Sequence, residues 1–429
     1  MQVTALIPKL FSSSTTQSAF LWVGILYFAE GFPFGLFFDA MPVYFRIHGV
    51  SLQEIGLMSA AGLAWTFKVF WAPAVDALGQ RRSWIVSCQC LLAMCIAAFI
   101  AVHPESSMPT IWILLVILAV LSATQDIAID AYTIELLDEK QLGIANGIRV
   151  AAYRVALIGS GGLFIVIAGL TGWNWAFLGT AFMIGVYAMI CAKAPIPQFT
   201  RRQMHTVTDA VVSPLRQLSA MPGFVFVMLF ILAFKLGDMA MGPMVKPFWV
   251  DQEFTPIQIG LVPGTVGVIC TIAGAMIGGI YTSRWGIFTA LWVFGLLQAG
   301  SNLVYAGVAA MPASISLMYM ASVSESLTAG LGTAPFMALL MRLCDKTHAA
   351  TQFALLSALF GFSRSISGMF SGWGAENLGY STYFTLTFFI ALPAFALLPW
   401  IQCALKARQW PSHDLSSVVE SKQNKMGFF

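Results

Sequence analysis

Two aspartates lie in a segment whose neighbours are suited to a membrane interior. Residues 122–137 read SATQDIAIDAYTIELL and directly follow the apolar run TIWILLVILAVL. Asp126 and Asp130 are four residues apart, which places both carboxylates on one face of a helix, beside Gln125. A charge inside a bilayer costs about 2.5–3.5 kcal/mol on insertion scales, and such residues are commonly functional. A buried carboxylate beside an arginine is ionised and takes up a proton when the arginine leaves, which is the chemistry that proton-coupled transport needs.

Ionisable residues also interrupt other apolar runs. At 1.5 Å per residue in a helix, most of them fall near the middle of a bilayer. We expect the neighbouring pairs Asp126–Arg154 and Asp130–Arg149; the alternative is that such pairs only hold two helices together. Besides Gln125, Asp126 and Asp130, the candidates for proton coupling and for a substrate cavity are Glu30, Lys68, Arg149, Arg154, Lys235, Asp238, Glu325 and Arg364.

The composition indicates a polytopic membrane protein. Of the 429 residues, 58% are hydrophobic and 10% are charged, against about 25% charged residues in soluble proteins. The seven cysteines mostly lie in apolar runs, and the five histidines fall in loops, helix ends or the tail, without the spacing of metal ligands. We therefore expect the lipid bilayer as a partner, and no metal, cofactor, nucleic acid or enzymatic activity.

Twelve apolar runs are long enough to span a bilayer, which takes about 20 helical residues. We predict spans at 19–45, 54–75, 83–102, 110–136, 143–170, 173–192, 222–250, 255–281, 287–310, 313–342, 348–375 and 381–404. With the N-terminus in the cytoplasm, fifteen Lys and Arg residues lie on the cytoplasmic side and only Arg46 on the other. This distribution follows the positive-inside rule and predicts that both termini are cytoplasmic.

The first six spans resemble the last six in sequence. ILYFAEG at 25–31 matches ILAFKLG at 231–237 with an offset of 206 residues, and SLQEIGL matches TPIQIGL with an offset of 204. Two pseudo-symmetric bundles of six helices are the plan of the major facilitator superfamily, so we expect an all-α membrane protein of that fold. The predicted parts are an N-terminal bundle at 1–192, a cytoplasmic linker at 193–221, a C-terminal bundle at 222–405 and a cytoplasmic tail at 406–429.

The loop after the second span supports this plan. It reads PAVDALGQRRSW, and Asp76, Arg81 and Arg82 match charged positions of the superfamily's loop at this place, although its leading glycine and one of its basic residues are absent. We expect these residues to tie helix ends together as a cytoplasmic gate. In this architecture helices 1, 4, 7 and 10 line a central cavity and helices 2, 5, 8 and 11 flank it. The charges within the predicted spans fall only on these two classes.

Glycine and proline motifs lie within three of the predicted spans. The motif GFPFG begins at Gly31 and ends at Gly35, and we expect it to break the first helix in mid-membrane. We expect GDMAMGP at 237–243 to break the seventh helix and AGLGTAP at 329–335 to break the tenth. Interrupted helices often surround a transport site. The alternative interpretation is close helix packing at small residues.

Several segments resemble one branch of the superfamily, the AmpG-type permeases. These are SATQDIAIDAY in helix 4, FKVFWAPAVD, YRVALIGSGGL and GTAPFMALLMRLCDKTHAATQFALLSAL. The resemblance implies a bacterial inner-membrane importer of anhydro-muropeptides that is driven by the proton gradient, and it carries Gln125, Asp126, Asp130 and Gly31 over as functional residues. The branch also contains siderophore importers and acetyl-CoA transporters, and a siderophore is the alternative cargo. We expect a monomer that binds the cargo and protons.

Overall fold

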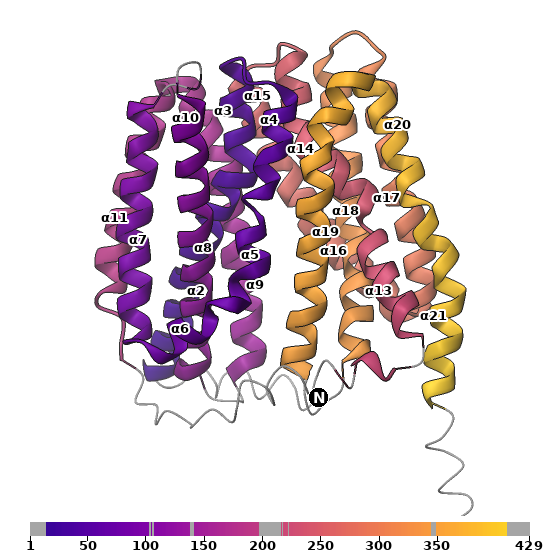
Figure 1. Cartoon of the computed structure of the whole chain (residues 1–429), viewed down its shortest axis with the longest axis horizontal. Helices are drawn as coiled ribbons and strands as arrows, with labels where there is room; N and C mark the ends of the chain where they lie inside the picture. Colours follow the sequence, from indigo (N-terminus) through magenta and orange to yellow (C-terminus); the bar gives the residue numbers. More distant parts are fainter. Residues whose placement is uncertain are drawn as a thin grey trace, which may run out of the picture.

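The computed structural model describes residues 14–102, 104, 107–137, 141–196, 216, 218–221, 223–344 and 349–409. Within these ranges every regular element is a helix, and eleven helices are long and apolar enough to cross a membrane. The predicted all-α membrane fold is therefore confirmed. The helices form two groups side by side, with the helices up to α11 in one and those from α13 onward in the other (Figure 1).

The first group contains five continuous crossings. They begin near the predicted positions, because a run of apolar residues in a bilayer must form a helix that satisfies its own backbone. The elements are α2 Ser14–Gly35, η1 Leu36–Ala40, α3 Met41–Ile47, α7 Arg81–Ala98, η4 Phe99–Ala101, α8 Met108–Leu136, α9 Leu142–Leu157, η6 Ile158–Leu163, α10 Phe164–Thr171 and α11 Trp173–Cys191.

The second predicted span is not one continuous helix. It consists of α4 Leu52–Leu57, η2 Met58–Ala60, α5 Leu63–Phe67, η3 Lys68–Phe70 and α6 Ala72–Ala77, which descend from the top to the bottom of Figure 1. Pro73 lacks a backbone N–H and so interrupts the helical hydrogen bonds just after the 3-10 turn. The broken crossing leaves eleven continuous spans where the sequence predicted twelve.

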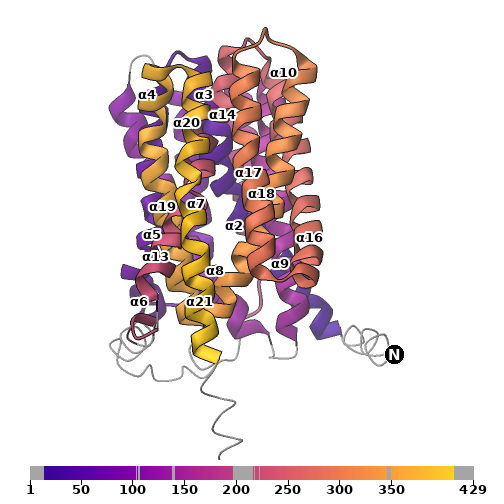
Figure 2. The same ribbon diagram turned by 90° about the vertical axis from the view of Figure 1, so that its right-hand side faces the viewer.

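The second group contains six crossings. Its elements are α13 Phe224–Ala233, α14 Leu236–Asp251, α15 Pro256–Leu261, η7 Val262–Val266, α16 Gly267–Trp285, α17 Ile287–Ala309, α18 Ile315–Leu343, α19 Ala349–Leu378, α20 Tyr380–Ala391 and α21 Pro393–Gln409. In Figure 2 the crossing made by α20 and α21 lies in front of the others. The predicted linker at 193–221 and the predicted tail at 406–429 lie mostly outside the described residues.

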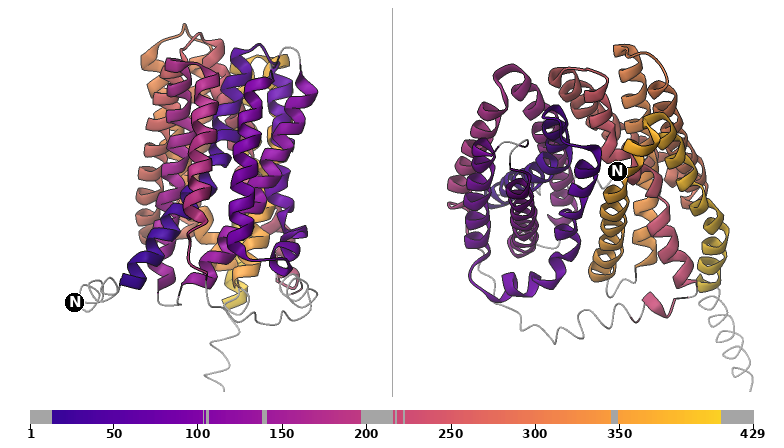
Figure 3. Two further views of the ribbon diagram at one scale, coloured as in Figure 1. Left: turned by 90° about the vertical axis from the view of Figure 1, so that its left-hand side faces the viewer. Right: turned by 45° about the horizontal axis from the view of Figure 1, so that its top comes forward.

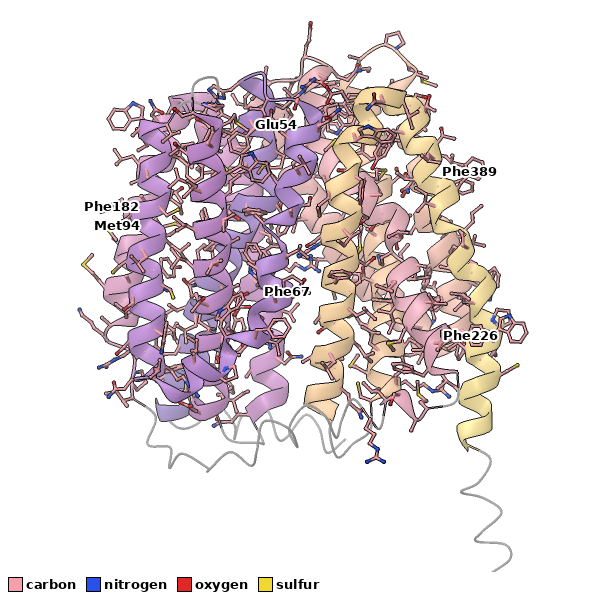
Figure 4. All side chains as sticks on the ribbon, viewed as in Figure 1. Glu54, Phe67, Met94, Phe182, Phe226 and Phe389 are labelled. Carbon is pink, nitrogen blue, oxygen red and sulfur yellow. The ribbon has the colours of Figure 1, made fainter. Side chains whose placement is uncertain are left out.

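The outer surface of both groups carries large apolar side chains. Met94 of α7, Phe182 of α11, Phe226 of α13 and Phe389 of α20 all project outward (Figure 4). Phe182 is 73% exposed, a value that a soluble protein would seldom give to a phenylalanine. A lipid environment removes the cost of this exposure, so these helix faces are suited to contact acyl chains.

The two groups contact each other through glycines near the upper end of Figure 1. Gly56 of α4 lies so close to α19 that an added Cβ would meet the Gly372 nitrogen at 2.6 Å. Gly162 of η6 packs against η7, where a Cβ on Gly264 would lie 2.7 Å from the Gly162 Cα. The view with the top tilted forward shows the two groups joined along this end (Figure 3). Small residues at these crossings let the two backbones approach closely.

A polar contact joins the groups at the same end. Arg46 of α3 donates from Nε to Asp251 Oδ1 at 2.5 Å and from a second nitrogen to Oδ2 at 2.8 Å. Tyr380 donates to the same carboxylate at 2.6 Å, and the Gln53 backbone N–H donates to Glu376 at 3.1 Å. Two parallel hydrogen bonds between a guanidinium and a carboxylate fix their relative orientation, so Arg46 and Asp251 align the two groups.

The predicted break of helix 1 between Gly31 and Gly35 is wrong. α2 continues through Pro33 to Gly35, and the irregular π-helical turn begins only at Leu36. A Cβ on Gly31 would lie 3.0 Å from the Tyr153 and Ala156 side chains, and one on Gly35 would overlap Ser160. The two glycines therefore serve close packing of α2 against α9 and η6, which is the alternative that the sequence left open.

Of the other two motifs, GDMAMGP and AGLGTAP, only the first lies beside a break in its helix. Helix 7 is interrupted at Phe234 and Lys235, just before GDMAMGP, and resumes as α14 at Leu236. Helix 10 is not interrupted, because α18 runs through AGLGTAP and Pro335 without a gap. Proline is tolerated inside a membrane helix where neighbouring groups satisfy the backbone atoms that it frees.

Candidate functional site

Asp130 is the centre of one group of polar side chains. Its Oδ1 accepts a hydrogen bond from Tyr27 of α2 at 2.7 Å and lies 3.4 Å from Arg149 of α9. The Arg149 guanidinium also covers the Tyr27 ring at 4.6 Å from the centroid. The predicted pair Asp130–Arg149 is therefore present, and Tyr27 completes it as a third member.

The predicted pair Asp126–Arg154 is wrong, because the partner of Asp126 is Lys68. The Lys68 Nζ lies 3.6 Å from Asp126 Oδ2, and only 9% of the Asp126 side chain is exposed. Arg149 and Arg154 are five residues apart, which separates them by about 140° around a helix, so α9 cannot present both to α8. No ion pair of Arg154 occurs among the residues that the structure describes.

Glu30 and Gln125 join α2 to the same cluster. The Gln125 amide donates to the Ala29 carbonyl at 2.8 Å, which fixes α8 against α2 at the residue next to Glu30. Glu30 is only 7% exposed and lies within electrostatic reach of Asp126, Asp130, Lys68 and Arg149. Its Oε2 is buried and has no hydrogen-bond partner in the described structure. We call Glu30, Asp126, Asp130, Lys68 and Arg149 the N-terminal charge cluster.

A second cluster surrounds Lys235, at the break between α13 and α14. Its Nζ donates to Gln298 Oε1 at 2.7 Å, to Thr333 Oγ1 at 3.1 Å and to the Ala329 carbonyl at 3.2 Å. The Asp238 carboxylate lies 3.9 Å away. Glu325 of α18 lies within electrostatic reach of both Lys235 and Asp238 and accepts a hydrogen bond from its neighbour Ser326 at 3.0 Å.

A cavity of about 360 Å³ opens between the two groups of helices. This volume is within the usual range for a small-molecule site, which is about 300–1,000 Å³. Its walls come from helix 1 with η1, from α4 and η2, and from α14, α18 and α19. They combine the aromatic side chains of Phe34, Phe37, Phe38 and Phe360 with the charged side chains of Asp39, Lys235, Asp238, Glu325 and Arg364.

The predicted site residues therefore do not form one site: some line the cavity and others lie away from it. Lys235, Asp238, Glu325 and Arg364 line this cavity, whereas the N-terminal charge cluster, Gln125 and Arg154 do not. Sequence reasoning missed Tyr27, which donates to Asp130 in the first cluster, and Gln298, which accepts from Lys235 in the second. Tyr27 precedes Glu30 by three residues and so shares its helix face, a signal that was available. Gln298 lies in a mostly apolar helix without charged residues, and nothing in the sequence connects it with Lys235.

The predicted gate residues contact the ends of neighbouring helices. Arg81 lies 3.1 Å from Glu135 at the end of α8 and donates to the Val75 carbonyl at 2.7 Å. Arg82 donates to the Ala194 carbonyl, beyond the end of α11, at 3.0 Å. Both arginines thus connect helices of the first group, and the side chain of Asp76 lies outside the described residues. A role for the three residues in gating stays a prediction.

Metal chemistry has no support among the residues that the structure describes. They contain no group of three or more His, Cys, Asp or Glu side chains that could hold a metal ion.

Asp39 and Lys246 form an ion pair between the two groups, at 2.6 Å. Replacing Lys246 with Met is expected to destabilise the protein, because Asp39 would keep its charge in the membrane without a partner. Loss of one partner of a buried pair costs about 3–5 kcal/mol, and less here because 34% of the Asp39 side chain is exposed. The midpoint of thermal unfolding in detergent measures the effect.

The control is the double variant Lys246→Met, Asp39→Asn, which removes both charges. It is expected to regain most of the lost stability, since neither charge is then buried alone. A double variant that is no more stable than Lys246→Met would contradict this explanation.

Two groups of membrane helices around a polar cavity, with buried charges beside it, define a membrane transporter. The model of the Major Facilitator Superfamily matches residues 23–306, and the chain belongs to this superfamily, whose members are transporters rather than enzymes. Within it the chain is similar to AmpG-type permeases, as the helix 4 motif predicted. The chain is 34% identical to the "Anhydromuropeptide permease" of Escherichia coli over 381 residues, which cover 87% of this chain and 78% of that protein.

Other comparisons agree. A "Putative transporter AmpG 4" of Rickettsia conorii is 27% identical, over 88% of this chain and 95% of the relative. Among solved structures, a bacterial homologue of the human lysosomal transporter Spinster has a TM-score of 0.74 at 13% identity, with 93% of this chain and 99% of that chain covered. A D-xylose-proton symporter has a TM-score of 0.70 at 12% identity, with 90% and 97% covered. At such low identities these two structures support the fold alone.

Proposed function

We propose that this protein imports anhydro-muropeptides across a bacterial inner membrane, coupled to the inward movement of protons, as a monomer. The observation that carries the choice of cargo is the 34% identity to the anhydromuropeptide permease of Escherichia coli over 87% of the chain. In this proposal residues 1–192 and 222–405 are the two bundles that move against each other. Residues 193–221 are then their cytoplasmic linker, and residues 406–429 are the cytoplasmic tail.

The N-terminal charge cluster supports the coupling to protons. It brings three carboxyl groups, of Glu30, Asp126 and Asp130, together with only two cations, Lys68 and Arg149. Asp130 and Asp126 each have a cation within 4 Å, whereas Glu30 forms no such ion pair among the described residues. One oxygen of Glu30 and one of Asp126 are buried there without a hydrogen-bond partner. An unpaired carboxylate is costly inside a bilayer, so we assign Glu30 as the group that takes up the proton.

The positions of the basic residues support the orientation. Arg81, Arg82, Lys193, Arg284 and Arg342 all lie at helix ends opposite the contact between Arg46 and Asp251. The positive-inside rule then places that contact on the outer side of the membrane, with both termini in the cytoplasm. Since the two groups are joined at the outer end, the proposal treats this conformation as inward-facing.

Uptake by cells that carry this gene tests the function. We expect accumulation of labelled anhydro-muropeptide above the level of cells with an empty vector, and loss of that accumulation when a proton uncoupler is added. A labelled ferric siderophore, supplied to the same cells, is expected to stay at the empty-vector level.

Each alternative has its own result in this assay. Accumulation of the siderophore alone would replace muropeptide by siderophore as the cargo. Accumulation of muropeptide that persists with the uncoupler would remove the coupling to protons and leave the cargo standing.

A further inference from the structure

Arg364 is a cation of the cavity wall that has no carboxylate partner among the described residues. It lies on α19, and its guanidinium packs over two rings of the first group of helices, 4.8 Å from the Phe34 centroid and 4.5 Å from the Phe38 centroid. Its Nε is buried and has no hydrogen-bond partner in this part of the chain. The aromatic faces hold the guanidinium by cation–π attraction without using its N–H donors.

Lys235 is the other cation among the described residues that line the cavity, and its donors are already used. An ammonium group has three N–H donors, and Lys235 directs them at Gln298, Thr333 and the Ala329 carbonyl. Lys246, which is not among the lining residues, donates to Asp39 at 2.6 Å. Asp39 is also the carboxylate that acts electrostatically on Arg364, but its negative charge is balanced by Lys246. Arg364 is thus the cavity cation whose charge the described protein leaves uncompensated.

We propose that Arg364 binds a carboxylate of the cargo, and that Phe34 and Phe38 orient its guanidinium for this contact. A guanidinium offers donors in a planar fork that matches the two oxygens of a carboxylate. A guanidinium that is already held in one orientation loses less side-chain entropy on binding than a freely rotating one. The two rings therefore orient Arg364 before the cargo binds. The inference rests on the proposed function, because peptide fragments of the cell wall carry free carboxylates.

A lysine would not replace Arg364, because the shape of the donor group matters as well as its charge. A lysine keeps the charge but has a point-like ammonium group, which cannot form two parallel hydrogen bonds with one carboxylate. Arg364→Lys therefore separates the shape of the donor from its charge, and Arg364→Gln removes both. Phe38→Leu keeps the arginine and removes one of the two rings that orient it.

Ligand binding to the purified full-length protein in detergent tests the proposal. The probes are anhydro-muropeptide, its peptide-free sugar, and a small pair that does not depend on the cargo: glutarate and its neutral diamide, glutaramide. Binding is measured from the ligand-induced rise in the midpoint of thermal unfolding, and the midpoint without ligand shows whether each variant is folded. The matched control is Arg342→Gln, an exposed arginine in the last turn of α18.

The wild-type protein and Arg342→Gln are expected to bind glutarate and anhydro-muropeptide, and to ignore glutaramide. Arg364→Gln and Arg364→Lys are expected to weaken binding of both carboxylate probes by about 10- to 100-fold, the worth of a charge-assisted hydrogen-bond pair. Phe38→Leu is expected to have a smaller effect in the same direction.

Two results separate this inference from the proposed function. If folded Arg364 variants bind anhydro-muropeptide and glutarate as tightly as the wild type, the carboxylate site at Arg364 is refuted and the transport function stands. If glutarate binding depends on Arg364 but anhydro-muropeptide does not bind at all, the site stands and the muropeptide assignment falls.

Discussion

Replacing Glu30 with Gln is expected to abolish accumulation of the cargo while leaving exchange of cargo across the membrane intact. Glutamine has nearly the shape of a protonated glutamate, so the variant is fixed in a proton-loaded form. Its cluster then holds two carboxylates and two cations, Lys68 and Arg149, and has no group left to release a proton. Without that release the downhill movement of protons cannot drive uphill movement of the cargo.

Two assays in vesicles check this result. Uptake driven by an imposed proton gradient is expected to fall at least tenfold in Glu30→Gln, which corresponds to about 1.4 kcal/mol or more of lost coupling. Exchange of internal unlabelled cargo for external labelled cargo, with no gradient, is expected to stay near the wild-type rate. Wild-type accumulation in Glu30→Gln would exclude Glu30 as the proton carrier.

Matched variants locate the effect in the cluster. Glu253→Gln makes the same chemical change at an exposed loop position between α14 and α15, and it is expected to behave as the wild type. Asp126→Asn and Asp130→Asn each leave a cation, Lys68 or Arg149, without its carboxylate. They are expected to reduce both driven uptake and exchange, because they disturb the packing of α8 as well as the charge balance.

The sequence located the membrane spans well because hydropathy is a property of each segment by itself. The structure begins helix 3 at Arg81, helix 4 at Met108 and helix 9 at Ile287, each within a few residues of the prediction. The break of helix 2 was not predictable in the same way, because the average hydropathy of 54–75 is unaffected by short 3-10 turns. That break places Lys68 on a turn that faces Asp126. Asp126 therefore pairs with Lys68 and not with the residue that the sequence predicted.

Pairing of charges is harder to predict because it depends on rotation about each helix. Asp130–Arg149 was predicted correctly, since depth in the membrane and one helix face were sufficient for it. The prediction of the pair Asp126–Arg154 was wrong because it considered the depth of the two residues in the membrane and not the direction in which each helix presents them. Asp39 and Lys246 are 207 residues apart, on helices 1 and 7, and only the packing of the two groups reveals that they pair.

A side chain at Gly264 is expected to reduce transport strongly, because it would keep the two groups of helices from joining at the end that the proposed orientation places outside the cell. An added Cβ would lie 2.7 Å from the Gly162 Cα and 2.8 Å from the Gly161 carbonyl oxygen, both backbone atoms that cannot rotate away. In Gly264→Val the joined conformation therefore carries a steric cost of roughly 1–3 kcal/mol. Conformations in which η6 and η7 are apart avoid that cost, so the ratio of their population to that of the joined conformation rises by a factor of roughly 5–150.

Labelling from outside the cell distinguishes this shift from simple unfolding. Met239 lines the cavity on α14, so a cysteine at that position is expected to be shielded from a membrane-impermeant thiol reagent while the outer end is joined. Gly264→Val is expected to increase its labelling severalfold and to reduce uptake at least tenfold, in line with the population shift. The control is Gly279→Val on α16, where an added Cβ meets nothing within 4 Å. If Gly264→Val is folded and transports normally, the close contact between η6 and η7 is not needed for the transport cycle. The contacts of Gly56 with Gly372 and of Arg46 with Asp251 at the same end are then sufficient to join the two groups.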